Sequence, residues 1–198
     1  MVGGVRRGRK VIVHFGPGYF YPGNIGREVR PNECHLSFEI DADKHEMFLK
    51  TKENYLKSDP GDAIKYSFSR NRSAGDTRLK SNSADEVHIK DVFTDRRAGQ
   101  PEEPLLAEAK RILKPGGAVI VTHTLGVDFF PKEKLLEIAR KFGFETEILF
   151  EARDASRLSP QQLGVLKQHL GSKFAELVVK NPGLIIEQNS FLAKLTKK

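Results

Sequence analysis

Short apolar runs and helical apolar stripes follow one another along the chain, and this pattern predicts alternating strands and helices. The segments 10–15 ("KVIVHF") and 118–122 ("AVIVT") are typical of buried strands. Further strands are expected at 35–40, 63–68, 86–93, 145–150 and 190–195. Strands that alternate with helices in this way predict a parallel sheet covered by helices.

The clearest helix lies in "EPLLAEAKRILKPGG". Its apolar residues at 105, 106, 109, 112 and 113 form one stripe. Lys114-Pro115-Gly116-Gly117 is expected to end this helix before the next strand begins. Other helices are expected at 43–56, 131–142, 159–170 and 172–180. The last two form a helical insertion at about 151–189, between the last two strands of a single domain that spans 1–198.

The composition indicates a folded, water-soluble chain. It has 198 residues, of which 38% are hydrophobic and 30% charged. No apolar run approaches the roughly 18 residues of a membrane span, so no membrane association is expected. The one cysteine, Cys34, excludes an intramolecular disulfide. We therefore expect a reducing, cytoplasmic compartment.

The net charge of +7 indicates which partners to expect. Excess lysine and arginine attract polyanions, which makes RNA a candidate partner, beside an anionic small molecule. No RNA-binding signature accompanies the charge. The sequence does not indicate an oligomeric state.

A glycine-rich turn follows the first expected strand, in "VIVHFGPGYFYPGNIG". Glycines at this place let the backbone turn tightly and approach a nucleotide-like ligand. In such strand–helix–strand units, an acidic residue at the end of the second strand binds ribose hydroxyls. Glu39 lies 21 residues after Gly18, close to the expected spacing of about 20. Asp41 follows it on the same face.

Four segments, taken in order, resemble the class I S-adenosylmethionine-dependent methyltransferases. "VIVHFGPG" is similar to the family's first motif, and "FEID" to the ribose-binding end of its second strand. "AGDTRLKSNSADEVHIKDVF" is similar to the segment that leads through the fourth strand. "LLAEAKRILKPGGAVIVT" is similar to the helix, turn and fifth strand, and it is the most specific of the four.

This resemblance implies a Rossmann-like α/β fold. Its seven-stranded, mostly parallel sheet has helices on both faces, and the antiparallel last strand lies between the fifth and sixth. It also implies a site for S-adenosylmethionine. Gly16 and Gly18 would lie against the methionine part of the cofactor. Glu39 would accept hydrogen bonds from the ribose hydroxyls, with Asp41 as a substitute.

The resemblance assigns three more positions. Asp76 would accept a hydrogen bond from the adenine amino group, with Thr77 beside it. Asp91 ends the fourth strand and would face the place where the methyl group meets the acceptor. It is the candidate general base or acceptor-orienting residue for methyl transfer to oxygen or nitrogen. Its alternative role is a helix cap or an ion pair with Arg96 or Arg97.

Two residues depart from the first motif of the family. His14 replaces the acid of the first strand, and Phe20 replaces the third glycine. The alternative to an enzyme is therefore a methyltransferase-like binding or interaction module that has lost the cofactor.

Other chemistries are disfavoured. No spaced histidine set such as H-E-x-x-H is present, so no metal site is expected, and no serine has the G-x-S-x-G context of a hydrolase. A Rossmann dehydrogenase also needs a glycine turn and an acid, but its glycine motif opens a helix directly. Pro17 and the aromatic run 19–22 fit that arrangement poorly.

Overall fold

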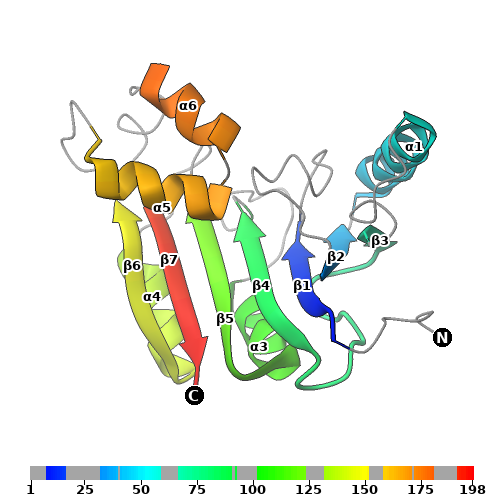
Figure 1. Ribbon diagram of the computed structural model, residues 1–198. Helices are drawn as coiled ribbons and strands as arrows, with labels where there is room; N and C mark the ends of the chain where they lie inside the picture. Colours follow the sequence, from blue (N-terminus) through cyan, green and yellow to red (C-terminus); the bar gives the residue numbers. More distant parts are fainter. Residues whose placement is uncertain are drawn as a thin grey trace.

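A seven-stranded sheet forms the centre of the protein in the computed structural model (Figure 1). The structure describes residues 8–16, 32–39, 41–58, 67–90, 92, 102–123, 132–151, 158–170, 172–180 and 191–198. The strands are β1 Lys10–Phe15, β2 Glu33–Glu39, β3 Ser67–Asn71, β4 Ala84–Lys90, β5 Leu113–His123, β6 Phe144–Glu151 and β7 Phe191–Lys197.

The strand order is β3-β2-β1-β4-β5-β7-β6. The pairs β1–β2, β1–β4, β2–β3 and β4–β5 are parallel, whereas β7 runs antiparallel to both β5 and β6. The Rossmann-like sheet expected from the sequence, with its antiparallel last strand between the fifth and sixth, is confirmed. Its order reverses between β1 and β4, and ligands bind beyond the carboxyl ends of the strands at such a point.

Helices cover both faces of the sheet. They are α1 Ala42–Ser58, α3 Glu102–Ile112, α4 Lys132–Lys141, α5 Pro160–Leu170 and α6 Ser172–Lys180. Side chains of β5 alternate between the two faces, so Val119 and Val121 pack in one core with α3 and α4. Ile120 points the other way, into a smaller core with Leu166 of α5 and Val178 of α6. None of the described helices is both long and apolar enough to cross a membrane.

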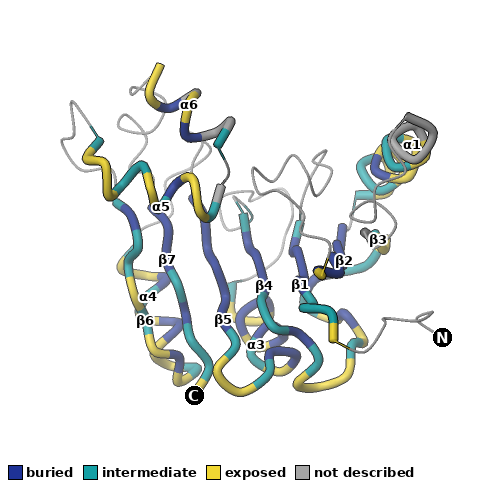
Figure 2. Tube along the Cα trace, viewed as in Figure 1, coloured by how far each residue is buried: buried dark blue, intermediate teal, exposed yellow. Residues whose placement is uncertain are grey.

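The helices α5 and α6 form the expected insertion between β6 and β7. They lie at the end of the sheet where β4 and β5 finish (Figure 1). Figure 2 shows the end of β5 beneath them as buried, whereas α5 and α6 each keep exposed turns. The insertion is therefore placed beside the edge at which open α/β sheets bind ligands.

The K-P-G-G segment corrects one expectation. It does not form a turn ahead of the strand, because β5 already begins at Leu113. Leu113 pairs with Ala84 and Ala118 with Glu86, so residues 114–117 form a bulge opposite a shorter stretch of β4. The first glycine of the segment has a φ of 75°, a conformation that glycine adopts without strain.

The strand expected at 10–15 is found with those bounds, and the other six strands differ from expectation at one or both ends. The strand expected at 63–68 is described as β3 and extends to Asn71. The strand expected at 86–93 is described as β4, which begins at Ala84 and ends at Lys90. Residues 63–66, 91 and 93 lie outside the described residues.

Candidate cofactor site

The carboxyl ends of β1, β2, β3 and β4 meet at one edge of the sheet, because these strands are parallel (Figure 1). Gly16 directly follows β1, and its N–H donates to the Phe38 carbonyl at 2.9 Å. Phe38 precedes Glu39, the last residue of β2. The N–H of Arg72, in the loop after β3, donates to the Glu39 carbonyl at 3.0 Å. The structure therefore brings together Gly16, Glu39 and the loop that carries Asp76 and Thr77.

Gly16 occupies a position that a larger residue would strain. Its φ is 60°, in the left-handed region that favours glycine. A Cβ added there would lie 2.8 Å from Cγ2 of Val92, the residue two places beyond the end of β4. The absence of a side chain thus lets β1 and the segment after β4 approach one another closely. This close approach lies at the edge where open α/β sheets bind ligands.

Glu39 is the better placed of the two ribose-binding candidates. Its side chain is buried, and Oε1 accepts a hydrogen bond from the Asp41 N–H at 3.1 Å. Asp41 instead caps helix α1, because its Oδ1 accepts from the N–H groups of Asp43 and Lys44 at 3.0 and 3.2 Å. The hydrogen bond from the Lys44 N–H is the main cause that lowers the pKa of Asp41. Glu39 therefore ends a strand at the edge where ligands bind, whereas Asp41 begins a helix.

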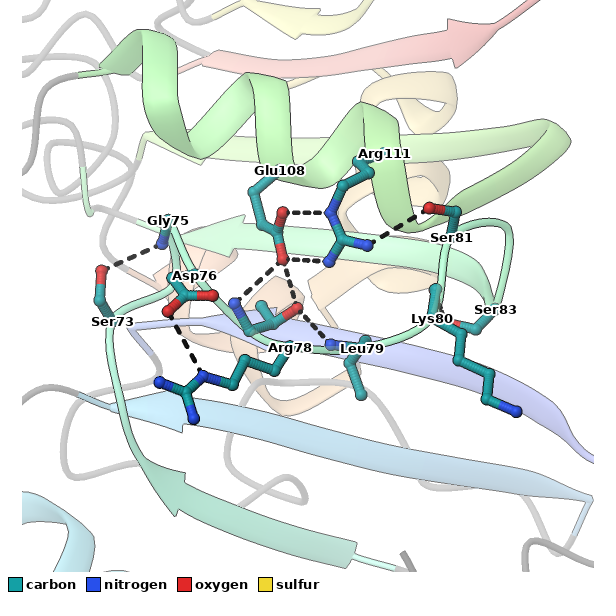
Figure 3. A network of polar contacts seen from close by, with 11 residues as sticks. Ser73, Gly75, Asp76, Arg78, Leu79, Lys80, Ser81, Ser83, Glu108 and Arg111 are labelled. Carbon is teal, nitrogen blue, oxygen red and sulfur yellow. Dashed lines mark hydrogen bonds and ion pairs between the residues drawn. The ribbon is translucent and has the colours of Figure 1, made fainter.

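Thr77 is buried and fixed to helix α3 by Glu108. Figure 3 shows this carboxylate bound to Arg111 of the same helix. The Thr77 N–H and Oγ1 both donate to Glu108 Oε1, at 3.0 and 2.5 Å. Arg111 donates from Nε to Oε2 and from Nη2 to Oε1 of the same carboxylate, each at 2.6 Å. Burial raises the pKa of Glu108, but the hydrogen bonds from Arg111 and Thr77 outweigh it, so the net pKa is lowered. The loop after β3 is thus held by a charged carboxylate.

Asp76 lies on the exposed side of the same loop. Its carboxylate is 3.7 Å from Arg78 Nε, and both side chains are largely exposed. The Asp76 N–H donates to the Ser73 carbonyl at 3.2 Å. Thr77 therefore anchors the loop while Asp76 presents its carboxylate to solvent, where a ligand amino group can reach it. The other two predicted site residues, Gly18 and Asp91, lie outside the described residues.

Sequence reasoning missed Glu108 and Arg111. A signal was present, because Glu108 follows Leu105 by three positions and so interrupts the apolar stripe of the helix. An acid on the buried face of a helix needs a partner. The pattern does not indicate that Thr77, 31 positions earlier, is that partner.

His14, at the position of the family's acid, belongs to a buried polar network. Its Nε2 lies 2.8 Å from Nδ1 of His35 on β2, and His35 Nε2 lies 3.3 Å from Glu33 Oε2. All three side chains are at most 4% exposed. The carboxylate orients His35 with a proton on Nε2, so that His35 Nδ1 accepts from His14 Nε2. With histidine in place of the family's acid, residue 14 thus hydrogen-bonds to the neighbouring strand β2.

The neighbouring strand β4 extends this polar face. His88 is buried, its ring centroid is 5.2 Å from that of His14, and its Nε2 lies 3.1 Å from Glu86 Oε2. Glu86 also accepts from Lys10 at 2.5 Å. Burial raises the pKa of Glu86, yet the hydrogen bonds and attraction from His88 and Lys10 lower it overall. The part of the chain that the structure describes contains no group of three or more ligand-type side chains arranged for a metal ion.

Solved structures show the same fold. No family model and no curated protein matches the sequence. A TehB-like S-adenosylmethionine-dependent methyltransferase from Corynebacterium glutamicum is 17% identical, with a TM-score of 0.58 over 98% of this chain and 83% of that one. Phosphoethanolamine N-methyltransferase 2 from Haemonchus contortus, solved with phosphomonomethylethanolamine and S-adenosylhomocysteine, is also 17% identical. Its TM-score is 0.59 over 98% of this chain, which spans 50% of that enzyme.

A third structure, the cyclase SpnF, is 18% identical, with a TM-score of 0.60 over 96% of this chain and 75% of that one. Because a cyclase shares the fold, the fold by itself does not specify the reaction. These identities establish architecture, in agreement with the strand order described above. The chain has the fold of the class I S-adenosylmethionine-dependent methyltransferases.

Proposed function

We propose that the protein is an S-adenosylmethionine-dependent methyltransferase that acts on oxygen or nitrogen of an anionic small molecule. The observation that carries this proposal is the pairing of Gly16 with Glu39 at the carboxyl edge of the sheet. Gly16 leads out of β1 with the left-handed φ that glycine adopts, and the buried carboxylate of Glu39 ends the neighbouring strand β2. This combination fits a nucleoside ligand that needs close backbone approach and an acceptor for its ribose hydroxyls.

The residues at this edge divide the binding of the cofactor among them. Glu39 would accept hydrogen bonds from the ribose, Asp76 would accept one from the adenine amino group, and Gly16 would leave room for the methionine part. When bound, S-adenosylmethionine supplies an activated methyl group on a sulfonium. The protein then needs chiefly to position the acceptor and exclude water. Asp91 would orient the acceptor or take up the proton that its O–H or N–H loses.

A small-molecule acceptor is supported by the ligand bound to a structural neighbour. The Haemonchus enzyme was solved with phosphomonomethylethanolamine, a small phosphorylated amine. The net charge of +7 fits such an anion equally well and keeps RNA as the second acceptor class. A cofactor-free interaction module is less well supported, because the glycine and the buried acid of the site are both present.

Methyl transfer tests this proposal directly. Purified protein incubated with methyl-labelled S-adenosylmethionine should transfer label to a member of a pool of phosphorylated and carboxylated metabolites, read by mass spectrometry. Asp91→Asn should reduce the rate by roughly 100-fold or more, as for a lost general base. Glu147→Gln, at an exposed position of β6, is the matched control and should keep the wild-type rate. If label appears only in added total RNA, the acceptor is RNA and the proposal of a small-molecule acceptor is wrong. If Asp91→Asn and wild type have equal rates, Asp91 has no role in methyl transfer.

A further inference from the structure

A groove runs between helices α5 and α6 and encloses about 500 Å³. This volume is within the usual range for small-molecule sites, about 300–1,000 Å³. Its lining comprises Pro160, Leu163, Gly164, Lys167, Ser172, Ala175, Glu176, Val179 and Lys180. The two helices lie at the end of the sheet where β1 and β2 also finish (Figure 1). Gly16 directly follows β1, and Glu39 is the last residue of β2. A molecule held in the groove would therefore lie on the same side of the protein as the proposed cofactor site.

Gly164 keeps this groove open. It lies in the middle of α5, where glycine costs about 1 kcal/mol relative to alanine. A Cβ added to Gly164 would meet no atom within 4 Å, so the packing of the described residues does not require a glycine there. The space that the missing side chain leaves belongs to the groove. Among the described residues, no packing contact accounts for this helix-weakening residue, and its open side faces the groove.

The groove combines an apolar wall with a basic rim. Leu163, Ala175 and Val179 supply apolar surface, and Val179 is 57% exposed. Lys167 and Lys180 are both exposed and line the groove. Glu176 is the one acid in the lining, so the rim carries a net positive charge. Exposed apolar surface beside this positive charge fits a ligand with an aliphatic part and an anionic group.

We propose that the α5–α6 groove binds the aliphatic chain of a free, single-chain amphiphilic anion, whose charged group pairs with Lys167 or Lys180. This inference rests on the proposed methyltransferase function in one respect, because it identifies this amphiphile as the acceptor. Binding itself does not require methyl transfer. It can therefore be measured alone.

Decanoate is the probe, and decyltrimethylammonium is its cationic counterpart with the same alkyl chain. Calorimetric titration should show saturable one-to-one binding of decanoate and at least roughly tenfold weaker binding of the cation. Gly164→Leu fills the groove and should weaken decanoate binding by roughly tenfold or more, with an unchanged or raised melting temperature. Gln168→Leu adds the same side chain to an exposed position of α5 outside the groove lining, and should bind decanoate as wild type does.

Any of three binding results would overturn the inference. They are an absence of saturable decanoate binding, equal binding of the two amphiphiles, and wild-type affinity in Gly164→Leu. A wild-type dimer that Gly164→Leu converts to a monomer would also overturn it, in favour of an interface between two copies of the chain. S-adenosylmethionine titrated into the same preparations reports on the cofactor site separately. Loss of amphiphile binding in the groove is therefore distinguished from loss of cofactor binding, on which the proposed function depends.

Discussion

Gly16→Ala is expected to abolish measurable S-adenosylmethionine binding and to lower the free energy of unfolding by about 1–3 kcal/mol. Two costs combine at this position. The φ of 60° is unfavourable for any residue with a Cβ, and the new methyl group would lie 2.8 Å from Cγ2 of Val92. Relief of that contact requires β1 and the segment after β4 to move apart at the edge where the cofactor is proposed to bind. Calorimetric titration and urea unfolding measure the two effects.

Gly116→Ala is the matched control for the backbone strain. Gly116 has a similar φ of 75°, but a Cβ there would meet no atom within 4 Å, and it lies in the bulge near the start of β5. This variant should lose stability and keep cofactor affinity. Adding Val92→Ala to Gly16→Ala should restore part of the binding, because it removes the nearest contact. Cofactor affinity that is unchanged in Gly16→Ala would exclude a close approach of ligand at this residue.

Glu108→Ala is expected to lower the free energy of unfolding by about 1–3 kcal/mol at pH 7, because the buried N–H and hydroxyl of Thr77 lose their acceptor. The loss should depend on pH. The pKa of Glu108 is lowered in the folded protein, so its contribution is complete above the unfolded pKa of about 4.3 and declines as the pH falls through the folded value. The gap between wild type and variant should therefore be constant from pH 6 to 7 and shrink below about pH 4.

Glu103→Ala on the same helix is the control for charge removal. Glu103 is about half exposed and pairs with Lys141 at 2.8 Å, so its loss should cost at most about 1 kcal/mol. Urea unfolding of both variants across this pH range makes the comparison. Equal destabilisation by the two substitutions, or a gap for Glu108→Ala that widens on acidification, would contradict the role assigned to the buried carboxylate.

The sequence predicted most of the sheet because strands such as β1 and the end of β5 are strongly apolar, and recognisable helices separate several of the strands. Each strand has a local pattern, and the resemblance supplied the order in which they pair. The bulge near the start of β5 was not predicted, because a proline and two glycines are equally typical of a turn. Only the pairing of β5 with β4 shows that these residues stay within the sheet.

Part of the candidate site was likewise predicted from the sequence, and part was not. Glu39 and Gly16 were predicted from spacing along the chain, and the structure places them side by side. The bond from Thr77 to Glu108 and the contact from His14 to His35 were not predicted, because both depend on which elements become neighbours in space. In β2, the alternation of Glu33, His35 and Ser37 with apolar residues marks a polar face, but it does not identify the partners of that face.

The central claim is that the edge formed by Gly16 and Glu39 binds S-adenosylmethionine. Calorimetric titration with S-adenosylmethionine and S-adenosylhomocysteine tests it most directly, on wild type, Glu39→Gln and the exposed control Glu147→Gln. The account predicts that both ligands bind wild type and the control. Glu39→Gln keeps an oxygen for the Asp41 N–H but loses the charge, and should bind about 1–3 kcal/mol more weakly. Absence of binding by either ligand, or equal affinity in wild type and Glu39→Gln, would contradict the claim.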